Sequence, residues 1–292
     1  MDYSSPQDKW DKCYWGGIDL SNKGIWQIPK VSRYPKSIFI VPSQVIEIDL
    51  SENNITTIKN LSQFTNTGFL CLSYNRIKKI QELDNLTELD RLDLSYNRIK
   101  KIEGLDTLKQ LTILVLSNNN IEKIEGLDNL DELVDLYLDN NPIAKIEGLE
   151  HLIKLERLAL RHTNIEKLEG LEHLKNLIHL KITHAKIKKI EGLDNLPNLR
   201  HLDLGHNNIK EIEGLDNLIN LEELYLSNNQ IEEIKGIDNC KSLKKVSIKE
   251  NKIQKLPNPL VESRKIVFRV HGNPLLESEY KKSEVGPYIF IW

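Results

Sequence analysis

One pattern of apolar and polar positions recurs along most of the 292-residue chain. Residues 92–113 read LDLSYNRIKKIEGLDTLKQLTI, residues 114–135 read LVLSNNNIEKIEGLDNLDELVD, and residues 202–223 repeat the frame. If the first leucine of LxLxxNxI is taken as an anchor, successive anchors lie 22 residues apart without a slip. The anchors are Ile48, Leu70, Leu92, Leu114, Leu136, Leu158, Leu180, Leu202, Leu224, Val246 and Phe268. Such self-similarity predicts a solenoid, in which each repeat packs only against its neighbours.

Each repeat predicts one coil of that solenoid. The alternation in LxL predicts a short strand whose leucines point into the coil, and strands one repeat apart would stack as a parallel sheet. An asparagine five positions after the anchor, such as Asn97, would bind backbone groups where the chain leaves the sheet. Glycines such as Gly104 permit a tight turn before the segment GLDNLxxL, which is short enough to predict 3₁₀ turns. A degenerate anchor at Ile18 brings the expected number of coils to about 12.

The motif LxxLxLxxNxIxxIEGLDNL resembles the 22-residue class of leucine-rich repeats. That class is typified by protein phosphatase 1 regulatory subunit 7, and the repeats of bacterial internalins are similar. The resemblance covers roughly residues 18–276. It implies an α/β fold, namely a right-handed leucine-rich-repeat solenoid with a parallel concave β-sheet and short 3₁₀ or irregular convex segments. It further implies a protein-binding adaptor, with regulation of a phosphatase 1-like serine/threonine phosphatase as the narrower expectation.

We expect three parts along the chain. Residues 1–17 would form an N-terminal cap with a short helix that begins at Ser5 and Pro6. Residues 18–276 would form the solenoid, with a degenerate first coil at 18–47 and regular repeats from residue 48. Residues 277–292 would form a C-terminal cap, in which VGPYIFIW predicts a strand or an extended lid. Caps are needed because the terminal coils would otherwise expose their leucines.

The outward-pointing residues of the strands and of the turns that follow them would line the concave face. Aromatic and arginine side chains on this face are typical of protein interfaces, although strands also favour aromatic residues for their own sake. We predict a partner site with Tyr74, Tyr96, Tyr137 and Ile113 as apolar anchors and with arginines and histidines as polar contacts. The candidate residues are Phe69, Tyr74, Arg91, Tyr96, Ile113, Val115, Asp135, Tyr137, Arg157, Arg161, His162, His179, His184, His201, His206 and Tyr225.

Five of the eight histidines fall in one region of that face. His162, His184 and His206 share the fourth position after the anchor, while His179 and His201 precede it. Three interpretations are open: a zinc or other transition-metal site, a pH-dependent binding surface, or a polar contact surface without special chemistry. We adopt the third and predict no metal ligands. In the same repeats Thr163 and Ala185 replace the recurring asparagine, which would leave a backbone group there without its usual partner.

Composition and charge narrow the classes of function. A net charge of −3 gives no basic field for nucleic acid or a membrane surface, and the apolar runs are shorter than a membrane span requires. The first residues show no secretory signal, and three scattered cysteines suggest a reducing compartment. A lysine line beside the turns, from Lys79 to Lys189, runs next to glutamates that would neutralise it.

No motif for phosphate binding, dinucleotide binding, zinc proteolysis or serine hydrolysis is present, so we predict neither an enzyme nor a cofactor. The expected protein is therefore a cytoplasmic, monomeric adaptor that binds a protein partner and neither nucleic acid nor membrane. The alternatives are an extracellular, internalin-like recognition protein and metal-dependent or pH-dependent binding through the histidines.

Overall fold

A computed structural model describes residues 17–28, 41–256, 266–275 and 288–291. Most of the two predicted caps and of the insertion after the first coil lies outside these residues, as does Cys13. The helix that we expect near Ser5 and Pro6 therefore stays a prediction.

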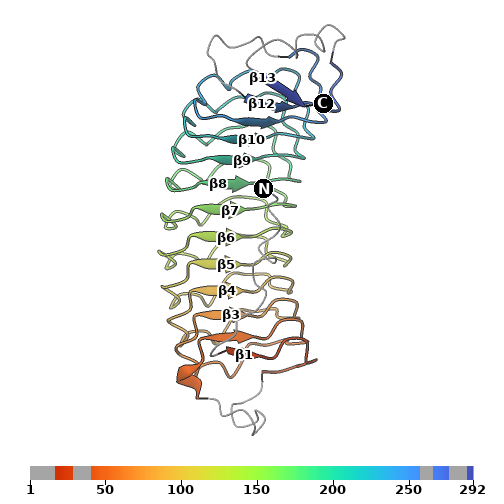
Figure 1. The fold of residues 1–292 in the computed structure, drawn as a ribbon. Helices are drawn as coiled ribbons and strands as arrows, with labels where there is room; N and C mark the ends of the chain where they lie inside the picture. Colours follow the sequence, from red (N-terminus) through yellow and green to blue (C-terminus); the bar gives the residue numbers. More distant parts are fainter. Residues whose placement is uncertain (1–16, 29–40, 257–265, 276–287, 292) are drawn as a thin grey trace.

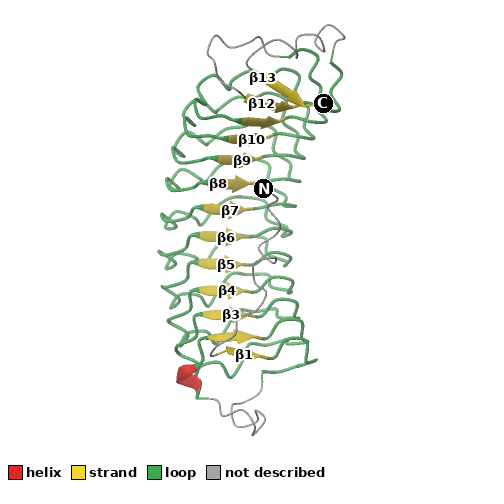
Figure 2. Cartoon of the chain, viewed as in Figure 1, coloured by secondary structure: helices red, strands yellow, loops and turns green. Residues whose placement is uncertain are grey.

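A single sheet of thirteen parallel strands runs through the described part of the chain, with the strands in sequence order (Figure 1). The elements are β1 (Gly17–Asp19), the 3₁₀ helix η3 (Pro42–Gln44), β2 (Glu47–Asp49), β3 (Phe69–Cys71), β4 (Arg91–Asp93), β5 (Ile113–Val115), β6 (Asp135–Tyr137), β7 (Arg157–Ala159), β8 (His179–Lys181), β9 (His201–Asp203), β10 (Glu223–Tyr225), β11 (Lys245–Ser247), β12 (Ile266–Arg269) and β13 (Tyr288–Ile291). Strands and loops make up nearly all of the fold (Figure 2). The predicted fold class is confirmed.

The anchors lie opposite one another across the sheet. Leu92 of β4 pairs with Leu114 of β5, which in turn pairs with Leu136 of β6, and all three side chains are buried. Because side chains alternate along a strand, the residues on either side of each anchor point outward from the coil. The fixed 22-residue step therefore sets the register, and it places equivalent residues of successive repeats side by side on the concave face.

The recurring asparagines form the predicted ladder. The side-chain oxygen of Asn97 accepts a hydrogen bond from the amide of Ile77 at 2.9 Å, and its nitrogen donates to the carbonyls of Leu72 and Leu94 at 2.9 and 3.1 Å. Each asparagine thus joins its own coil to the preceding one. At Thr163 the hydroxyl bonds only the carbonyl of Leu160, at 3.0 Å, and Ala185 has no polar group to offer.

The convex side is built from turns. The amide of Leu108 bonds the carbonyl of Leu105, and that of Leu111 bonds the carbonyl of Leu108, so the expected three-residue spacing of hydrogen bonds is present. These turns do not extend into helices, and η3 is the only helix in the described residues. No helix in this part of the chain has the length and apolar character needed to cross a membrane.

Candidate protein-binding surface

The residues before the anchors form one line across the concave face. Phe69, Arg91, Ile113, Asp135, Arg157, His179 and His201 are in register on the seven consecutive strands from β3 to β9. Val115, Tyr137 and Tyr225 lie on the other side of their anchors, on β5, β6 and β10. The structure therefore brings the predicted strand residues onto one surface.

A second line follows the ends of the strands, where the fourth residue after each anchor has a left-handed backbone. We call it the left-handed column. It comprises Asn22, Glu52, Tyr74, Tyr96, Asn118, Asn140, His162, His184, His206, Asn228, Glu250 and Gly272, with φ between 51° and 75°. Left-handed backbone costs most L-residues roughly 1–2 kcal/mol, and asparagine tolerates it best after glycine. The column therefore favours asparagine on structural grounds, and its tyrosines and histidines depart from that preference.

Tyr74 and Tyr96 are adjacent in this column. Their amides donate to the carbonyls of Ser95 and Ser117 at 3.0 and 2.9 Å, so the fold holds both residues in the left-handed conformation. Their rings stack with centroids 4.1 Å apart and an angle of 8° between the planes. Tyr74 remains 44% exposed and Tyr96 37% exposed. The pair presents rigid aromatic surface to solvent.

The five histidines form two stacks. His184 lies between His162 and His206 in the left-handed column, with ring centroids 4.1 and 3.9 Å away, and His179 stacks on His201 at 4.4 Å. Burial, followed by the neighbouring His201, lowers the pKa of His179 from 6.5 to about 4. Burial, followed by His206 and His162, also lowers the pKa of His184. His179 and His184 therefore resist taking up protons in the free protein.

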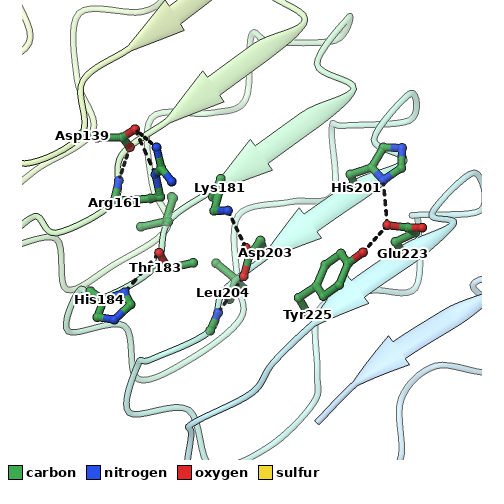
Figure 3. Close-up of polar contacts among 12 residues, drawn as sticks. Asp139, Arg161, Lys181, Thr183, His184, His201, Asp203, Leu204, Glu223 and Tyr225 are labelled. Atoms are coloured by element: carbon green, nitrogen blue, oxygen red, sulfur yellow. Dashed lines mark hydrogen bonds and ion pairs between the residues drawn. The ribbon is translucent and has the colours of Figure 1, made fainter. Parts of the chain in front are cut away.

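Ion pairs between adjacent coils flank the histidine stacks (Figure 3). The Nε and Nη2 of Arg161 donate to Oδ2 of Asp139 at 3.0 and 2.7 Å, and the amide of Arg161 donates to Oδ1 at 2.7 Å. Arg157 Nη1 donates to Oδ1 of Asp135 at 2.8 Å. Lys181 Nζ lies 3.2 Å from Oδ2 of Asp203. These contacts fix the long side chains in place before any partner arrives.

A further network ends at the second histidine stack. Lys245 Nζ donates to the hydroxyl of Tyr225 at 2.7 Å, that hydroxyl donates to Glu223, and Glu223 Oε2 lies 3.4 Å from Nδ1 of His201. Figure 3 shows His201 and Tyr225 converging on the Glu223 carboxylate. The network joins strands β9, β10 and β11 on the concave face.

The structure changes how some candidate residues would act. Asp135 is only 8% exposed, and its carboxylate is bound by Arg157 and by the hydroxyl of Tyr137, so it would act on a partner by positioning these two side chains. Sequence reasoning left Asp139, Asp203, Glu223 and Lys245 out of the candidate set. Their spacing carried the signal, because opposite charges 22 residues apart, such as Asp139 and Arg161, must lie on neighbouring coils.

The two described cysteines, Cys71 and Cys240, are buried. Cys71 is buried beside Ser73, and burial raises the pKa of its thiol to about 12, which disfavours the reactive thiolate. Cys240 is fully buried in the place of a core leucine and donates to the carbonyl of Leu215 at 3.6 Å. Within the described residues no three histidine, cysteine or acidic side chains are arranged to hold a metal ion.

A parallel sheet with one strand per 22-residue coil and an asparagine ladder defines the class of leucine-rich-repeat solenoids. The chain matches the family of Leucine Rich repeats (2 copies) over residues 69–108, 109–151, 175–217, 197–239 and 219–261. These segments span more than half of its length, so the chain belongs to the leucine-rich-repeat family. Domains of this family are protein–protein interaction modules, generally without enzymatic activity.

Three solved structures illustrate the similarity. An internalin, InlF of Listeria monocytogenes, is 21% identical with a TM-score of 0.68 over 86% of this chain and 83% of that one. The leucine-rich-repeat domain of APL1B is 16% identical, with a TM-score of 0.70 over 94% of this chain and 88% of that one. A structure of Latrophilin 3 and Unc5D in complex with the leucine-rich repeats of FLRT2 is matched with 21% identity and a TM-score of 0.66, over 83% of this chain and 84% of that one. At these identities the likeness shows the fold alone. No protein of curated function matches the sequence significantly.

Proposed function

We propose that this protein is a non-enzymatic adaptor that binds a protein partner on its concave face. The stacked Tyr74 and Tyr96, which follow β3 and β4, would supply the apolar contact, together with Ile113 and Tyr137 on the next two strands. Arg157, Arg161 and the histidines would supply polar contacts further along. This arrangement resembles the known anatomy of interfaces, in which a few tyrosine and arginine side chains contribute most of the binding energy.

The observation that carries the proposal is the conformation of Tyr74 and Tyr96. Both have φ of 53°, a value that bulky residues rarely adopt, whereas Asn118, Asn140 and Asn228 fill equivalent positions without strain. Strained backbone at a surface persists where the side chain has a task, so the observation points from strain to function. The stack already restricts both rings, and the entropic cost of ordering them on binding is correspondingly small.

We propose a protein rather than a nucleic acid or a membrane as the partner. The lysines beside the turns face glutamates, as in the pairs Lys79–Glu103 and Lys101–Glu125, both at 3.9 Å, and the concave arginines are bound by aspartates. A polyanion would have to compete with these carboxylates for the paired cations. A cytoplasmic, monomeric protein remains our proposal, and the buried, free thiol of Cys71 supports a reducing compartment.

Two narrower versions of this proposal differ in the protein that the concave face would bind. The repeat's resemblance to protein phosphatase 1 regulatory subunit 7 supports regulation of a phosphatase 1-like enzyme. The structural likeness to InlF supports recognition of an extracellular protein instead, and FLRT2 shows this fold in a complex with other proteins. We favour the phosphatase version, because the few cysteines, among them the free thiol of Cys71, support a reducing compartment.

The test is affinity capture from the source organism's cytosol, with identification of the bound proteins by mass spectrometry. Wild type is compared with the double variant Tyr74→Asn/Tyr96→Asn. Asparagine is the residue that other repeats use in the left-handed column, so the variant keeps the backbone and removes only the rings. Lys188→Gln, which changes an exposed side chain, serves as the control for nonspecific effects.

Capture of a protein by wild type and by the control, but not by the double variant, supports binding through the tyrosine pair. If that protein is a serine/threonine phosphatase, the narrower version is supported as well. Equal capture by the double variant would contradict the proposed site. A specific partner found only when extracellular proteins are used as the source would favour the internalin-like version.

A further inference from the structure

Charge is distributed unevenly along the concave face. At the end formed by β2 to β4 the charged residues are acidic apart from Arg91, namely Glu47, Asp49, Glu52 and Asp93. At the other end Lys245, Lys249 and Arg269 bring cations, with Glu223 and Glu250 as the anions. The histidine stacks lie between these ends, on the coils of β7, β8 and β9. A partner segment with negative charge would be directed toward the histidines and away from β2.

Around the stacks, the permanent charges are balanced. Arg157 pairs with Asp135, Arg161 with Asp139, and Lys181 with Asp203. The charge of this region is therefore set by the imidazoles. In their neutral form they add nothing, and each proton that they take up adds one positive charge to an otherwise neutral surface.

The charged groups around each stack determine how readily its imidazoles take up a proton. His184 faces His162 and His206 in its own column, with Arg161 as a neighbouring cation and Asp203 as a neighbouring anion. His179 faces His201, with Arg157 and Arg200 as cations and Glu223 as the anion. Glu223 is already bonded by the hydroxyl of Tyr225, and Asp203 by Lys181. Like charges would therefore meet within each stack. His184 has Asp203, which is already paired with Lys181, as its neighbouring anion, whereas His201 lies beside Glu223.

Two hydrogen bonds involve imidazoles of the left-handed column. The Nδ2 of Asn228 lies 3.3 Å from Nε2 of His206, and the hydroxyl of Thr183 lies 3.4 Å from Nδ1 of His184. An amide nitrogen donates, so Nε2 of His206 is the acceptor in this arrangement. An anionic group from outside would favour protonation, because it supplies a counter-charge to the column of His162, His184 and His206.

We propose that the coils of β7, β8 and β9 bind an acidic segment of the protein partner and take up protons as they do so, which makes binding stronger as the pH falls. The inference rests on the proposed protein-binding function and adds to it the chemistry of the partner and its regulation. Binding and protonation are linked reciprocally, so each proton taken up changes the affinity by about tenfold per pH unit in the titration range. An acidic segment would thus be held weakly near neutral pH and firmly in a mildly acidic environment.

The experiment uses a fluorescently labelled oligo-aspartate peptide, whose side chains have an ordinary pKa of about 3.9 and stay ionised throughout. Its binding to the full chain is measured by anisotropy between about pH 7.5 and pH 5.5, the range in which imidazoles titrate. An oligo-asparagine peptide is the neutral control. The matched variant is His162→Asn/His184→Asn/His206→Asn, because asparagine already occupies the left-handed column at Asn118, Asn140 and Asn228.

We expect the affinity of wild type for oligo-aspartate to rise at least about tenfold over this range, which corresponds to uptake of one or more protons. The triple variant should fold, lose most of that rise and keep its weak binding near neutral pH. Calorimetry in two buffers of different ionisation enthalpy should show proton uptake by wild type only. Adding His179→Gln and His201→Gln to the triple variant should remove the remaining pH dependence of its affinity for oligo-aspartate.

Several results would overturn the inference. These are affinity that does not change with pH, an equal rise in the triple variant, or no binding of oligo-aspartate at either pH. Binding of a single-stranded oligonucleotide with the same pH dependence, and not of oligo-aspartate, would overturn the acidic protein segment in favour of nucleic acid. The proposed function fails separately, since its test depends on Tyr74 and Tyr96, which lie on other coils.

Discussion

The rings of Tyr74 and Tyr96 stack at a centroid distance of 4.1 Å, although each residue has a backbone conformation that tyrosine rarely adopts. Two opposing contributions to stability follow. The stack contributes about 0.5–1.5 kcal/mol, while the two left-handed backbones together cost roughly 2–4 kcal/mol relative to a relaxed conformation. Aromatic packing at this site therefore does not explain on stability grounds why the tyrosines are present.

The variant Tyr74→Asn/Tyr96→Asn tests this balance. It loses the stack but relieves the strain, so its free energy of unfolding should lie within about 1 kcal/mol of wild type or above it. The two single variants and the double variant form a cycle, measured by urea denaturation, whose coupling energy should be about 0.5–1.5 kcal/mol in favour of the pair. A loss of several kcal/mol in the double variant would mean that the tyrosines are structural.

The interruption of the asparagine ladder gives a second prediction. Asn207 accepts from the amide of Ile187 at 3.0 Å and donates to the carbonyls of Ile182 and Leu204 at 2.8 and 3.0 Å, whereas Ala185 offers the preceding coil none of these bonds. Ala185→Asn should supply them, because the residue before it, His184, has the φ found at the same place in the other coils.

We expect Ala185→Asn to raise the free energy of unfolding by about 1–2 kcal/mol, since it satisfies a buried amide as well as adding contacts. Chemical denaturation measures the change. Asn97→Ala provides the reverse comparison and should cost about 2–4 kcal/mol, because it leaves the amide of Ile77 without its partner. If Ala185→Asn destabilised the protein, the backbone around Ala185 would have to differ from that of the other coils.

The sequence was sufficient to predict the strands and the ladder because both depend on a local motif repeated at a fixed step. One motif places Leu92 in the core and Asn97 at the bend, and the same step then applies to every coil. The interruption of the asparagine ladder at Ala185 was also visible in the sequence. The order of the strands followed as well, since a solenoid allows each coil only two neighbours.

The left-handed backbone of Tyr74 was not predicted, because nothing in the letters LxLxxNxI distinguishes it from an extended residue. Gly272 and the asparagines at equivalent places carried the signal, but tyrosine and histidine obscured it. The charged network was missed for a different reason. Candidate residues were chosen one at a time by type, whereas Asp139 and Glu223 gain their meaning from residues on the adjoining strand, namely Arg161 and His201.

Close packing between coils gives a third prediction, at Gly148. Its φ is 67°, and a Cβ added there would lie 2.5 Å from the carbonyl oxygen of Ile124 on the preceding coil. Gly148→Ala should therefore destabilise the protein by about 2 kcal/mol or more, since it adds a backbone clash to the cost of the left-handed conformation. Gly24 has the same φ of 67° but nothing within 4 Å, so Gly24→Ala isolates the conformational cost, about 1 kcal/mol. Equal losses in the two variants, measured by thermal unfolding, would show that the coils can separate at little cost.

The stack of His179 on His201 predicts how stability depends on pH. The pKa of His179 is about 4 in the folded protein and 6.5 ordinarily, so between these values the unfolded chain binds a proton more readily than the folded one. Protonation then favours unfolding, and the contribution of His179 is fully present above about pH 6.5 and is lost as the pH falls toward 4. Because the side chain is only half-buried, we expect a loss of about 1–2 kcal/mol rather than the full value of the shift.

Urea denaturation at several pH values measures this loss of stability. His179→Gln should flatten this part of the profile, whereas His173→Gln, on an exposed convex turn, should leave it unchanged. Carboxylates also affect acid stability, but they are common to all three proteins, so the difference between His179→Gln and wild type isolates the histidine. If wild type and His179→Gln lost stability in parallel, the stack would not be what opposes protonation in the folded protein.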